Sequence, residues 1–125
     1  MEGTWDVRVT FRNCQTGAPV RIVRTLSTFS GAGTLMETGA DDTPNRRSSG
    51  QGTWRHIGER HYITVSRFFR FHPDGTFAET QKITRRIELS DDGQEFRATT
   101  CVEVFDAGDS LVRTNCATER ARRLE

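Results

Sequence analysis

Residues 3–12 read GTWDVRVTFR, and apolar and polar side chains alternate strictly along this stretch. One face carries Trp5, Val7, Val9 and Phe11, whereas the other carries polar and charged residues. A period of two is typical of a β-strand with one buried face and one solvated face. We therefore expect an all-β protein whose first strand runs from Trp5 to Phe11.

Seven further strands are predicted downstream at regular spacing. They are Val20–Phe29, Thr34–Thr38, Thr53–Ile57, Tyr62–Phe71, Thr76–Leu89, Glu95–Phe105 and Leu111–Ala121. No stretch of useful length has the period of an amphipathic helix. Eight strands in a meander, joined by turns that contain glycine, predict an eight-stranded antiparallel up-and-down β-barrel, because closure leaves no unpaired edge. A two-layer β-sandwich is the alternative.

The length of 125 residues fits one domain, residues 1–125, that can bury a core without metal or disulfide staples. Eighteen Lys and Arg residues nearly balance seventeen Asp and Glu residues. The chain therefore lacks the large excess of positive charge that favours binding to nucleic acid or to an anionic membrane, and we expect neither as a partner. No apolar stretch is long enough to span a bilayer. We expect a small-molecule ligand and a monomer or homodimer.

Gly3-Thr4-Trp5, at the head of the first strand, resembles the G-x-W signature of lipocalins and related calycins. In that family the tryptophan closes one end of an eight-stranded barrel, and an arginine after the last strand packs across its ring. The resemblance offers Arg120, Arg122 and Arg123 for that role, and a cation over an indole face is favourable in itself. The chain departs from the family because it is shorter, lacks the long helix after the barrel, and has Ser90-Asp91-Asp92 in place of Thr-Asp-Tyr. The resemblance implies a barrel that holds a ligand and does not name the ligand.

The connection from Gly39 to Gly50 is the only long polar one, a feature typical of lids and binding loops, with a plain surface loop as the alternative. In a meander it lies at the end opposite Trp5, which would be the mouth of the barrel. Trp54 is expected to begin a strand at this mouth, where its indole can stack on a ligand. A rim or core position is the alternative for Trp54, and His56 shares its strand face.

The fifth and sixth strands are predicted to bring charged residues into the interior. The more apolar face of the fifth strand includes Arg67, and the same face of the sixth includes Glu79, Gln81 and Arg85. The hairpin register that we expect pairs Phe69 with Glu79 and Arg67 with Gln81. Buried charges cost several kcal/mol unless they are paired or used. A bend in the long sixth strand that turns Glu79 or Arg85 to solvent is the alternative.

These patterns favour binding of a small apolar or amphipathic molecule, including an anionic one, inside the barrel. The expected contacts are Trp54, His56, Arg67, Phe69, Phe71, Glu79 and Gln81, and Arg46 or Arg47 of the long connection would meet a ligand carboxylate.

The alternative is a cofactor-independent isomerase or cyclase, in which Glu79 moves a proton and Arg67 steadies an enolate or carboxylate. A third hypothesis is an interaction module or an OB-like nucleic-acid binder, because arginines are interspersed with phenylalanines in residues 67–71.

No metal or cofactor is expected. His56, His61 and His72 lack metal-ligand spacing, and no phosphate-binding loop or dinucleotide fingerprint is present.

The three cysteines, Cys14, Cys101 and Cys116, form no C-x-x-C motif. The first and last strands of a closed barrel are neighbours, so the geometry permits a Cys14–Cys116 bridge, with Cys101 left over or competing for Cys116. Three reduced thiols are the alternative. We expect an exported protein if a leader has been removed, and a cytoplasmic one otherwise.

Overall fold

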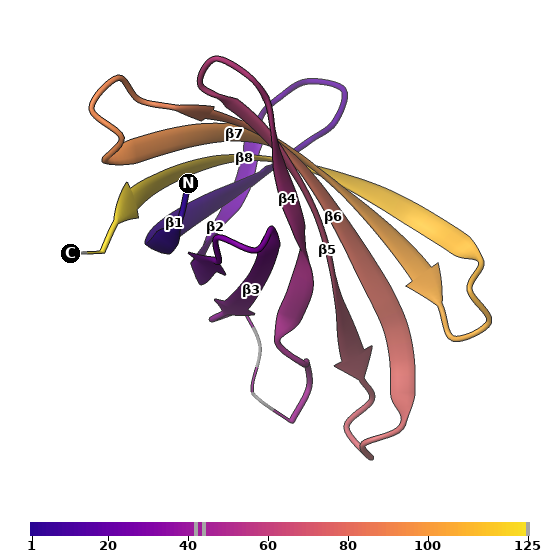
Figure 1. Ribbon diagram of the computed structural model, residues 1–125. Helices are drawn as coiled ribbons and strands as arrows, with labels where there is room; N and C mark the ends of the chain where they lie inside the picture. The colour runs from indigo at the N-terminus through magenta and orange to yellow at the C-terminus, as the bar shows by residue number, and fades with distance from the viewer. Residues whose placement is uncertain (42, 44, 125) are drawn as a thin grey trace.

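The computed structural model describes residues 1–41, 43 and 45–124, and eight strands make up its regular structure. They are β1 (Gly3–Arg12), β2 (Pro19–Phe29), β3 (Thr34–Gly39), β4 (Gly50–Gly58), β5 (His61–Phe71), β6 (Phe77–Leu89), β7 (Glu95–Asp106) and β8 (Leu111–Arg123). Each strand pairs with the next, and β8 pairs with β1, which closes the barrel (Figure 1). This confirms the predicted eight-stranded antiparallel up-and-down barrel and excludes the sandwich. Among the described residues, no helix is long and apolar enough to cross a membrane.

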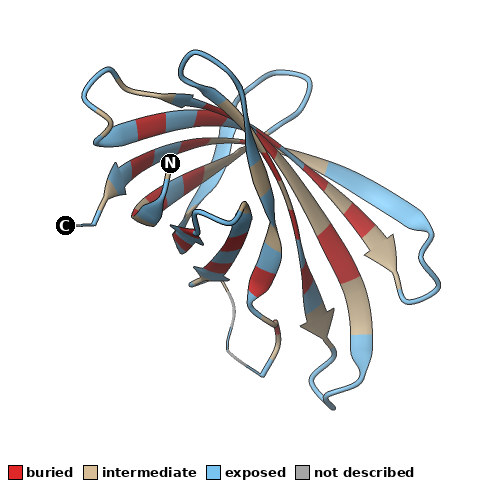
Figure 2. Cartoon of the chain, viewed as in Figure 1, coloured by how far each residue is buried: buried red, intermediate tan, exposed pale blue. Residues whose placement is uncertain are grey.

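The alternation in β1 has the predicted orientation. Trp5, Val7 and Val9 are buried, whereas Arg8 between them is exposed. Figure 2 shows the same alternation of buried and exposed residues along most strands. The wall of the barrel around β1 is therefore apolar on the inside and charged on the outside. β1 pairs with a neighbouring strand along both of its edges.

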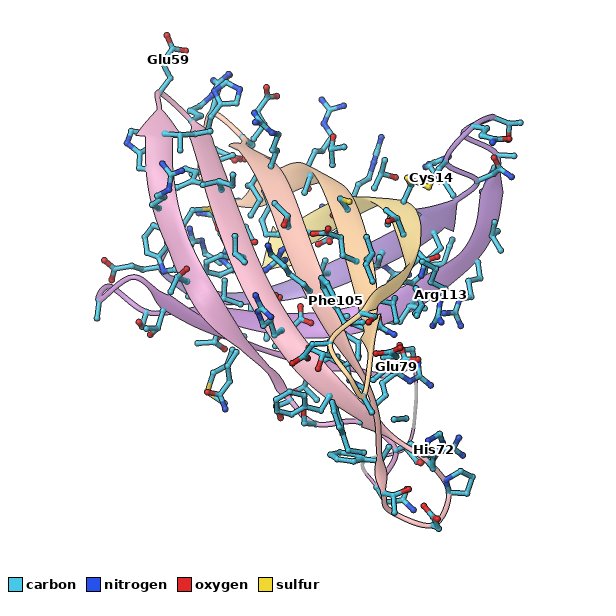
Figure 3. All side chains as sticks on the ribbon, turned by 90° about the vertical axis from the view of Figure 1, so that its right-hand side faces the viewer. Cys14, Glu59, His72, Glu79, Phe105 and Arg113 are labelled. Atoms are coloured by element: carbon cyan, nitrogen blue, oxygen red, sulfur yellow. A yellow bond between two sulfur atoms is a disulfide. The ribbon has the colours of Figure 1, made fainter. Side chains whose placement is uncertain are left out.

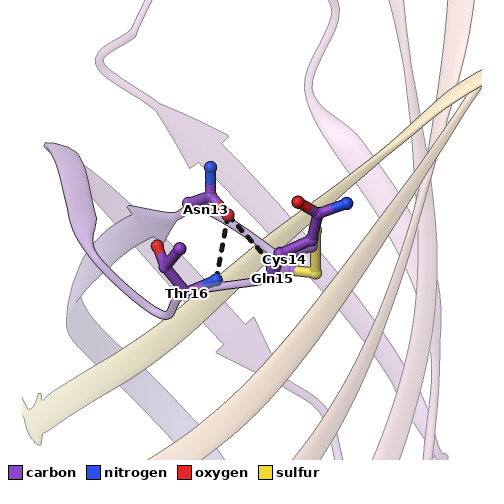
Figure 4. Close-up of a disulfide and its surroundings, with 5 residues drawn as sticks. Asn13, Cys14, Gln15 and Thr16 are labelled. Atoms are coloured by element: carbon purple, nitrogen blue, oxygen red, sulfur yellow. Dashed lines mark hydrogen bonds between the residues drawn. A yellow bond between two sulfur atoms is a disulfide. The ribbon is translucent and has the colours of Figure 1, made fainter.

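A disulfide joins Cys14, in the β1–β2 connection, to Cys116 of β8 (Figure 4). Asn13 shapes this connection, because its Oδ1 accepts hydrogen bonds from the backbone N–H groups of Gln15 and Thr16. Cys101 is free and exposed, and it lies directly opposite Cys116 in the β7–β8 ladder. The structure thus contains the bridge that the closed barrel permits.

The β5–β6 hairpin differs from the predicted register by one residue. Phe71 pairs with Phe77 beside the turn, but a bulge follows, and Arg70 then pairs with Glu79. The extra residue in the bulge is Ala78. Because side chains in a strand alternate with a period of two, this slip turns the opposite face of β5 inward.

The inner faces of β7 and β8, which the sequence pattern leaves open, are now assigned. β7 buries Phe96, Ala98, Thr100, Val102 and Val104, and β8 buries Ala117, Glu119 and Ala121. The alanines leave room for the larger rings of neighbouring strands. On the inside of β8, the acidic side chain of Glu119 lies between the small residues Ala117 and Ala121.

Candidate ligand site inside the barrel

Aromatic rings close one end of the barrel around Trp5. This side chain is fully buried, and its ring lies 5.0 Å from that of Phe96. Arg123 also lies over the indole of Trp5, with its guanidinium carbon 4.3 Å from the ring centroid. The arginine of the expected pairing is therefore Arg123. It is held there because its side chain also donates hydrogen bonds to the carbonyl oxygen of Gly93.

Trp54 belongs to this closed end, so its predicted position at the mouth is wrong. Its indole Nε1 donates to the carbonyl oxygen of Ser30, and its ring packs at 6.0 Å from Phe29 and 5.9 Å from Tyr62. The reason is the length of β4, which begins at Gly50 rather than at Thr53 and so carries Trp54 into its middle. The alternative position in the core and rim is the one observed.

His56 shares the strand face of Trp54, as predicted, but it is exposed. Its ring stacks on Tyr62 at 4.9 Å, and its Nε2 lies within hydrogen-bond distance of the carbonyl oxygen of Glu59. Figure 3 shows Glu59 at the end of the molecule opposite the turn of His72. His56 is therefore also distant from the mouth.

The middle of the barrel holds a buried ion pair. Arg85 of β6 donates from Nη1 to Glu119 of β8 at 3.2 Å and from Nε to the Thr64 hydroxyl at 3.0 Å. The other carboxylate oxygen of Glu119 accepts a hydrogen bond from Thr100 at 2.6 Å. Both charged side chains are at most 4% exposed. Threonines that point inward from β5 and β7 thus satisfy charges that would otherwise be costly to bury.

A second charged group joins the first from the β3–β4 connection. Arg47 folds into the barrel, where Nη1 lies 2.7 Å from Asp41 and Nη2 lies 3.6 Å from Glu37. Its guanidinium carbon is 3.6 Å from the ring centroid of Phe68, a stacking geometry that arginine favours. Arg47 and Glu37 are buried although they belong to a loop and to a short strand.

Backbone contacts fix the segment that carries Arg47. The amide of Ser48 donates to the carbonyl oxygen of Phe69 at 2.8 Å, and the amide of Phe71 donates to that of Arg46 at 2.7 Å. Residues 46–48 therefore extend the sheet along the end of β5 and direct Arg47 inward.

Two glycines make room for these charges. A Cβ at Gly50 would meet Cγ of Glu37 at 2.5 Å, and one at Gly39 would clash with Nη1 of Arg47. Larger residues at either end of the connection would therefore push the buried charges apart.

The five ionisable groups carry one more acid than base. Glu37, Asp41 and Glu119 face Arg47 and Arg85. Burial raises the pKa of Glu37 above its usual value of 4.5, and Glu119 and Asp41 raise it further, whereas Arg85 and Arg47 lower it. Burial outweighs the arginines because Arg47 makes no hydrogen bond to this carboxylate through Nη2. Glu37 is thus the group of this site that holds its proton above the usual pH range of a carboxyl.

Several buried polar atoms keep unused hydrogen-bonding capacity. They are Nη2 of Arg47, Nη2 of Arg85, and the hydroxyls of Ser27 and Ser66. Buried donors without partners are uncommon in folded proteins. Two guanidinium donors therefore have no hydrogen-bond partner among the described residues and can donate to an acceptor in the interior.

A cavity of about 40 Å³ lies between these charges and the mouth. Its apolar wall consists of Val9, Phe11, Val23, Phe68, Ile83 and Val102, and its polar wall consists of Thr25, Glu37, Asp41, Arg47, Gln81, Thr100 and Glu119. Phe11, Val23 and Ile83 are half-buried, which marks the side that faces solvent. The volume suits a few water molecules, whereas drug-sized ligands need roughly 300 Å³ or more.

The predicted site residues of β5 do not reach this cavity. Arg67 is exposed and pairs with Lys82 on the outer face, and Phe69 packs at 5.7 Å against Phe77, also outside. Phe71 is half-buried beside the turn, and its amide bonds to Arg46. The inward orientation expected for Arg67 and Phe69 is therefore wrong. The bulge at Ala78 is the cause.

The predicted residues of β6 do face inward. Gln81 lines the cavity and donates a hydrogen bond to Glu79 at 2.7 Å. Glu79 lies nearer the mouth, where its ion-pair partner is Arg113 of β8 at 3.3 Å rather than Arg67 (Figure 3). The expected meeting of Arg67 with Glu79 and Gln81 does not occur, because these side chains lie on opposite faces of the sheet.

Sequence reasoning missed Glu37 and Glu119 as interior residues. The usable signal for Glu119 is its position between Ala117 and Ala121, since small residues at a spacing of two mark an inner face. Glu37 follows Leu35 at the same spacing in β3. Arg85 was on the predicted inner face of the sixth strand, and Arg47 was expected as a ligand contact.

Within the described part of the chain, no three His, Cys, Asp or Glu side chains gather in a way that would hold a metal ion. No family model matches the chain, and no curated protein matches it.

Proposed function

We propose that the barrel binds a small amphipathic molecule between the buried charges and the mouth. The observation that carries this proposal is a cavity with one apolar wall and one wall of ion-paired side chains. The apolar part of the ligand would pack on Val9, Val23 and Ile83. Its polar group would accept hydrogen bonds from Arg47, whose Nη2 has no other hydrogen-bond partner among the described residues.

Binding requires the Arg47 segment to move. The cavity is too small for a ligand of ten or more heavy atoms. Residues 46–48 are held to the end of β5 by backbone hydrogen bonds with Phe69 and Phe71, whereas Arg85 and Glu119 lie within long strands and are also held by Thr64 and Thr100. An anionic group of the ligand would replace Asp41 and Glu37 as the partner of Arg47, so that this guanidinium keeps a charged partner in both states.

Kinship with the calycins is part of this proposal. It is supported by the Gly3-Thr4-Trp5 triplet, the eight-stranded barrel and the position of Arg123 across the ring of Trp5. The Cys14–Cys116 bridge supports an oxidising, exported setting for the protein.

The test combines native mass spectrometry of the mildly extracted protein with calorimetric titration of decanoate and decanol. Ile83→Trp should block the cavity and abolish binding, whereas the matched control Ile63→Trp, on the outer face of β5, should bind as the wild type does. Arg47→Met should weaken decanoate more than decanol, because it keeps the stacking on Phe68 and loses the charge. Absence of a co-purifying molecule together with absence of decanoate and decanol binding would refute the proposal.

A second candidate function follows from the raised pKa of Glu37 in the wall of the same cavity. We propose acid–base catalysis there as the alternative, with Glu37 in the role that the sequence assigned to Glu79. Its carboxylate would take a proton from the carbon next to a carbonyl, and Arg47 would steady the resulting enolate until a proton returns.

The test is deuterium exchange of cyclohexanone in heavy water, followed by NMR. Wild-type protein should speed the exchange, and Glu37→Gln should remove the acceleration while the protein stays folded. Equal exchange in both proteins would exclude this alternative.

A further inference from the structure

Three arginines stand side by side on the outer surface of the barrel. Arg8 of β1 is the register partner of Arg120 of β8, and Arg120 is the register partner of Arg97 of β7. All three are exposed. Because neighbouring strands lie about 5 Å apart, the three side chains form a ladder of positive charges across the sheet. We call these three residues the arginine ladder.

The arginine ladder is unpaired, although acidic residues lie close to it. Asp6 forms an ion pair with Arg24 at 2.8 Å, and Glu95 forms one with Arg122 at 2.7 Å. Glu88 is the register partner of Arg97, and its carboxylate lies 3.2 Å from Nε2 of His61, which is cationic only when protonated. Within residues 1–41, 43 and 45–124, the ladder arginines make no ion pair and no side-chain hydrogen bond. Asp6 and Glu95 thus neutralise flanking arginines rather than the ladder, and Glu88 is the acidic residue that lies opposite one end of the ladder.

This arrangement costs stability in the empty protein, because like charges directly opposite each other in a sheet repel. A purely solvated surface would gain from alternation of charge, as the next row does with Asp6, Arg122 and Glu95. The ladder therefore suits a ligand that supplies the missing negative charge.

The surface at the ladder is hollowed on both sides. One hollow, of about 630 Å³, extends toward Asp6 and Glu95. The other, of about 590 Å³, extends toward Thr99 and Thr118. Both include Arg97 and Arg120, so the ladder lies where the two hollows meet. Each volume is in the range of small-molecule sites.

We propose that the arginine ladder binds a small polyanion, a molecule with several phosphate or carboxylate groups. The guanidinium group of arginine binds phosphate and carboxylate groups through two parallel hydrogen bonds. Three guanidinium groups in a row therefore match several anionic groups in one molecule. The threonine hydroxyls of the adjoining hollow add neutral hydrogen bonds. The arginine ladder lies on the outer face of the barrel, whereas the cavity lies inside it, and Glu119 is the residue that lines both the cavity and one of the hollows.

The test is calorimetric titration of the full chain with sodium triphosphate, citrate and monophosphate at low ionic strength. Triphosphate or citrate should bind at one site per chain, more tightly than monophosphate, and added salt should weaken the binding. Preference for triphosphate or for citrate identifies the anionic group. Arg97→Gln and Arg120→Gln should each weaken the binding about tenfold, the loss of one charge-assisted contact.

Two control variants and one stability measurement check that the anion binds at the arginine ladder itself. Arg55→Gln, on β4 halfway round the barrel, and Ile83→Trp, in the cavity, should leave triphosphate binding unchanged. Without anion, Arg120→Gln should not lower the melting temperature, since it relieves repulsion. The proposal is overturned if neither polyanion binds, if Arg55→Gln weakens binding as much as Arg120→Gln, or if Arg120→Gln destabilises the empty protein more than Arg55→Gln does.

Discussion

Arg85 and Glu119 meet at the centre of the barrel, with 3.2 Å between Nη1 and Oε1 and with both side chains almost fully buried. Both side chains are withdrawn from bulk solvent, so each charge depends on the other and on the threonine beside it. This pair sets the polarity of the interior. It also separates the aromatic closed end from the cavity.

Breaking this pair from one side should be strongly destabilising. Arg85→Met leaves Glu119 buried without its cation, and we expect a loss of about 3–5 kcal/mol in the free energy of unfolding. The double variant Arg85→Met/Glu119→Leu should recover much of that loss, because no uncompensated charge remains. Urea denaturation measures both. Lys82→Met, which removes a half-exposed partner of Glu103 at 4.0 Å, is the control and should cost less than about 1 kcal/mol. A loss for Arg85→Met no larger than that of the control would contradict the assigned role.

The stability of the protein should depend on pH through Glu37. The folded state raises the pKa of this carboxyl above 4.5. Between pH 4.5 and the folded-state pKa, the folded protein therefore holds a proton that the unfolded chain has released. Its contribution is fully present below pH 4.5 and is lost as pH rises through the folded-state pKa.

Glu37→Gln, which stays neutral, should therefore remove a decline in stability that begins as pH rises above 4.5. The measurement is the free energy of unfolding as a function of pH, compared between wild type and variant. Parallel curves for the two proteins would show that this carboxyl does not titrate abnormally. Glu2→Gln, at the exposed amino terminus, provides a surface control.

The Cys14–Cys116 bridge should be a major stabilising element. It closes a loop across 102 positions of the sequence, and the loss of chain entropy for such a loop corresponds to roughly 4–5 kcal/mol. Cys14→Ser/Cys116→Ser should lose about that amount in urea denaturation. Cys101→Ser, at the exposed free thiol, should change stability by less than about 0.5 kcal/mol. Thiol titration of the denatured protein should find one thiol before reduction and three after it, and three before reduction would disprove the bridge.

The contact between Arg123 and Trp5 should stabilise the closed end. Arg123→Ala loses the stacking on the indole, which contributes about 0.5–2 kcal/mol, and also the hydrogen bonds to Gly93. We expect a lower melting temperature together with a change in tryptophan fluorescence. Arg122→Ala is the matched control, because its side chain is 78% exposed and its ion-pair partner is Glu95. Equal effects of the two variants would argue against a structural role for the ring contact.

Much of the architecture was predictable because it depends on local patterns. The alternation in residues 3–12 and the glycine-containing turns define eight strands whose bounds agree with the structure within about three residues. The adjacency of the first and last strands also follows from strand order alone, and with it the geometry that permits Cys14 to meet Cys116. These features need no knowledge of side-chain packing.

The candidate site depended on positions that no local pattern reveals. The sequence of β5 favours burial of the face with Arg67 and Phe69, yet one bulged residue in β6, Ala78, turns Thr64 and Ser66 inward instead. The more apolar face of β5 is therefore not the inner one. The inner face carries Thr64, whose hydroxyl accepts a hydrogen bond from Arg85, 21 residues away in the sequence.

The sequence by itself therefore determined the number and order of the strands, since periodicity and turn chemistry act over a few residues, whereas the closed end around Trp5 was expected from the resemblance carried by Gly3-Thr4-Trp5. Only the tertiary structure decided which charges share the interior. Glu37, Arg47, Arg85 and Glu119 come from four separate segments, and their meeting depends on inter-strand register and on a connection that folds back into the barrel. Register is a collective property of paired strands, so a single inserted residue can exchange the inside of a strand for its outside.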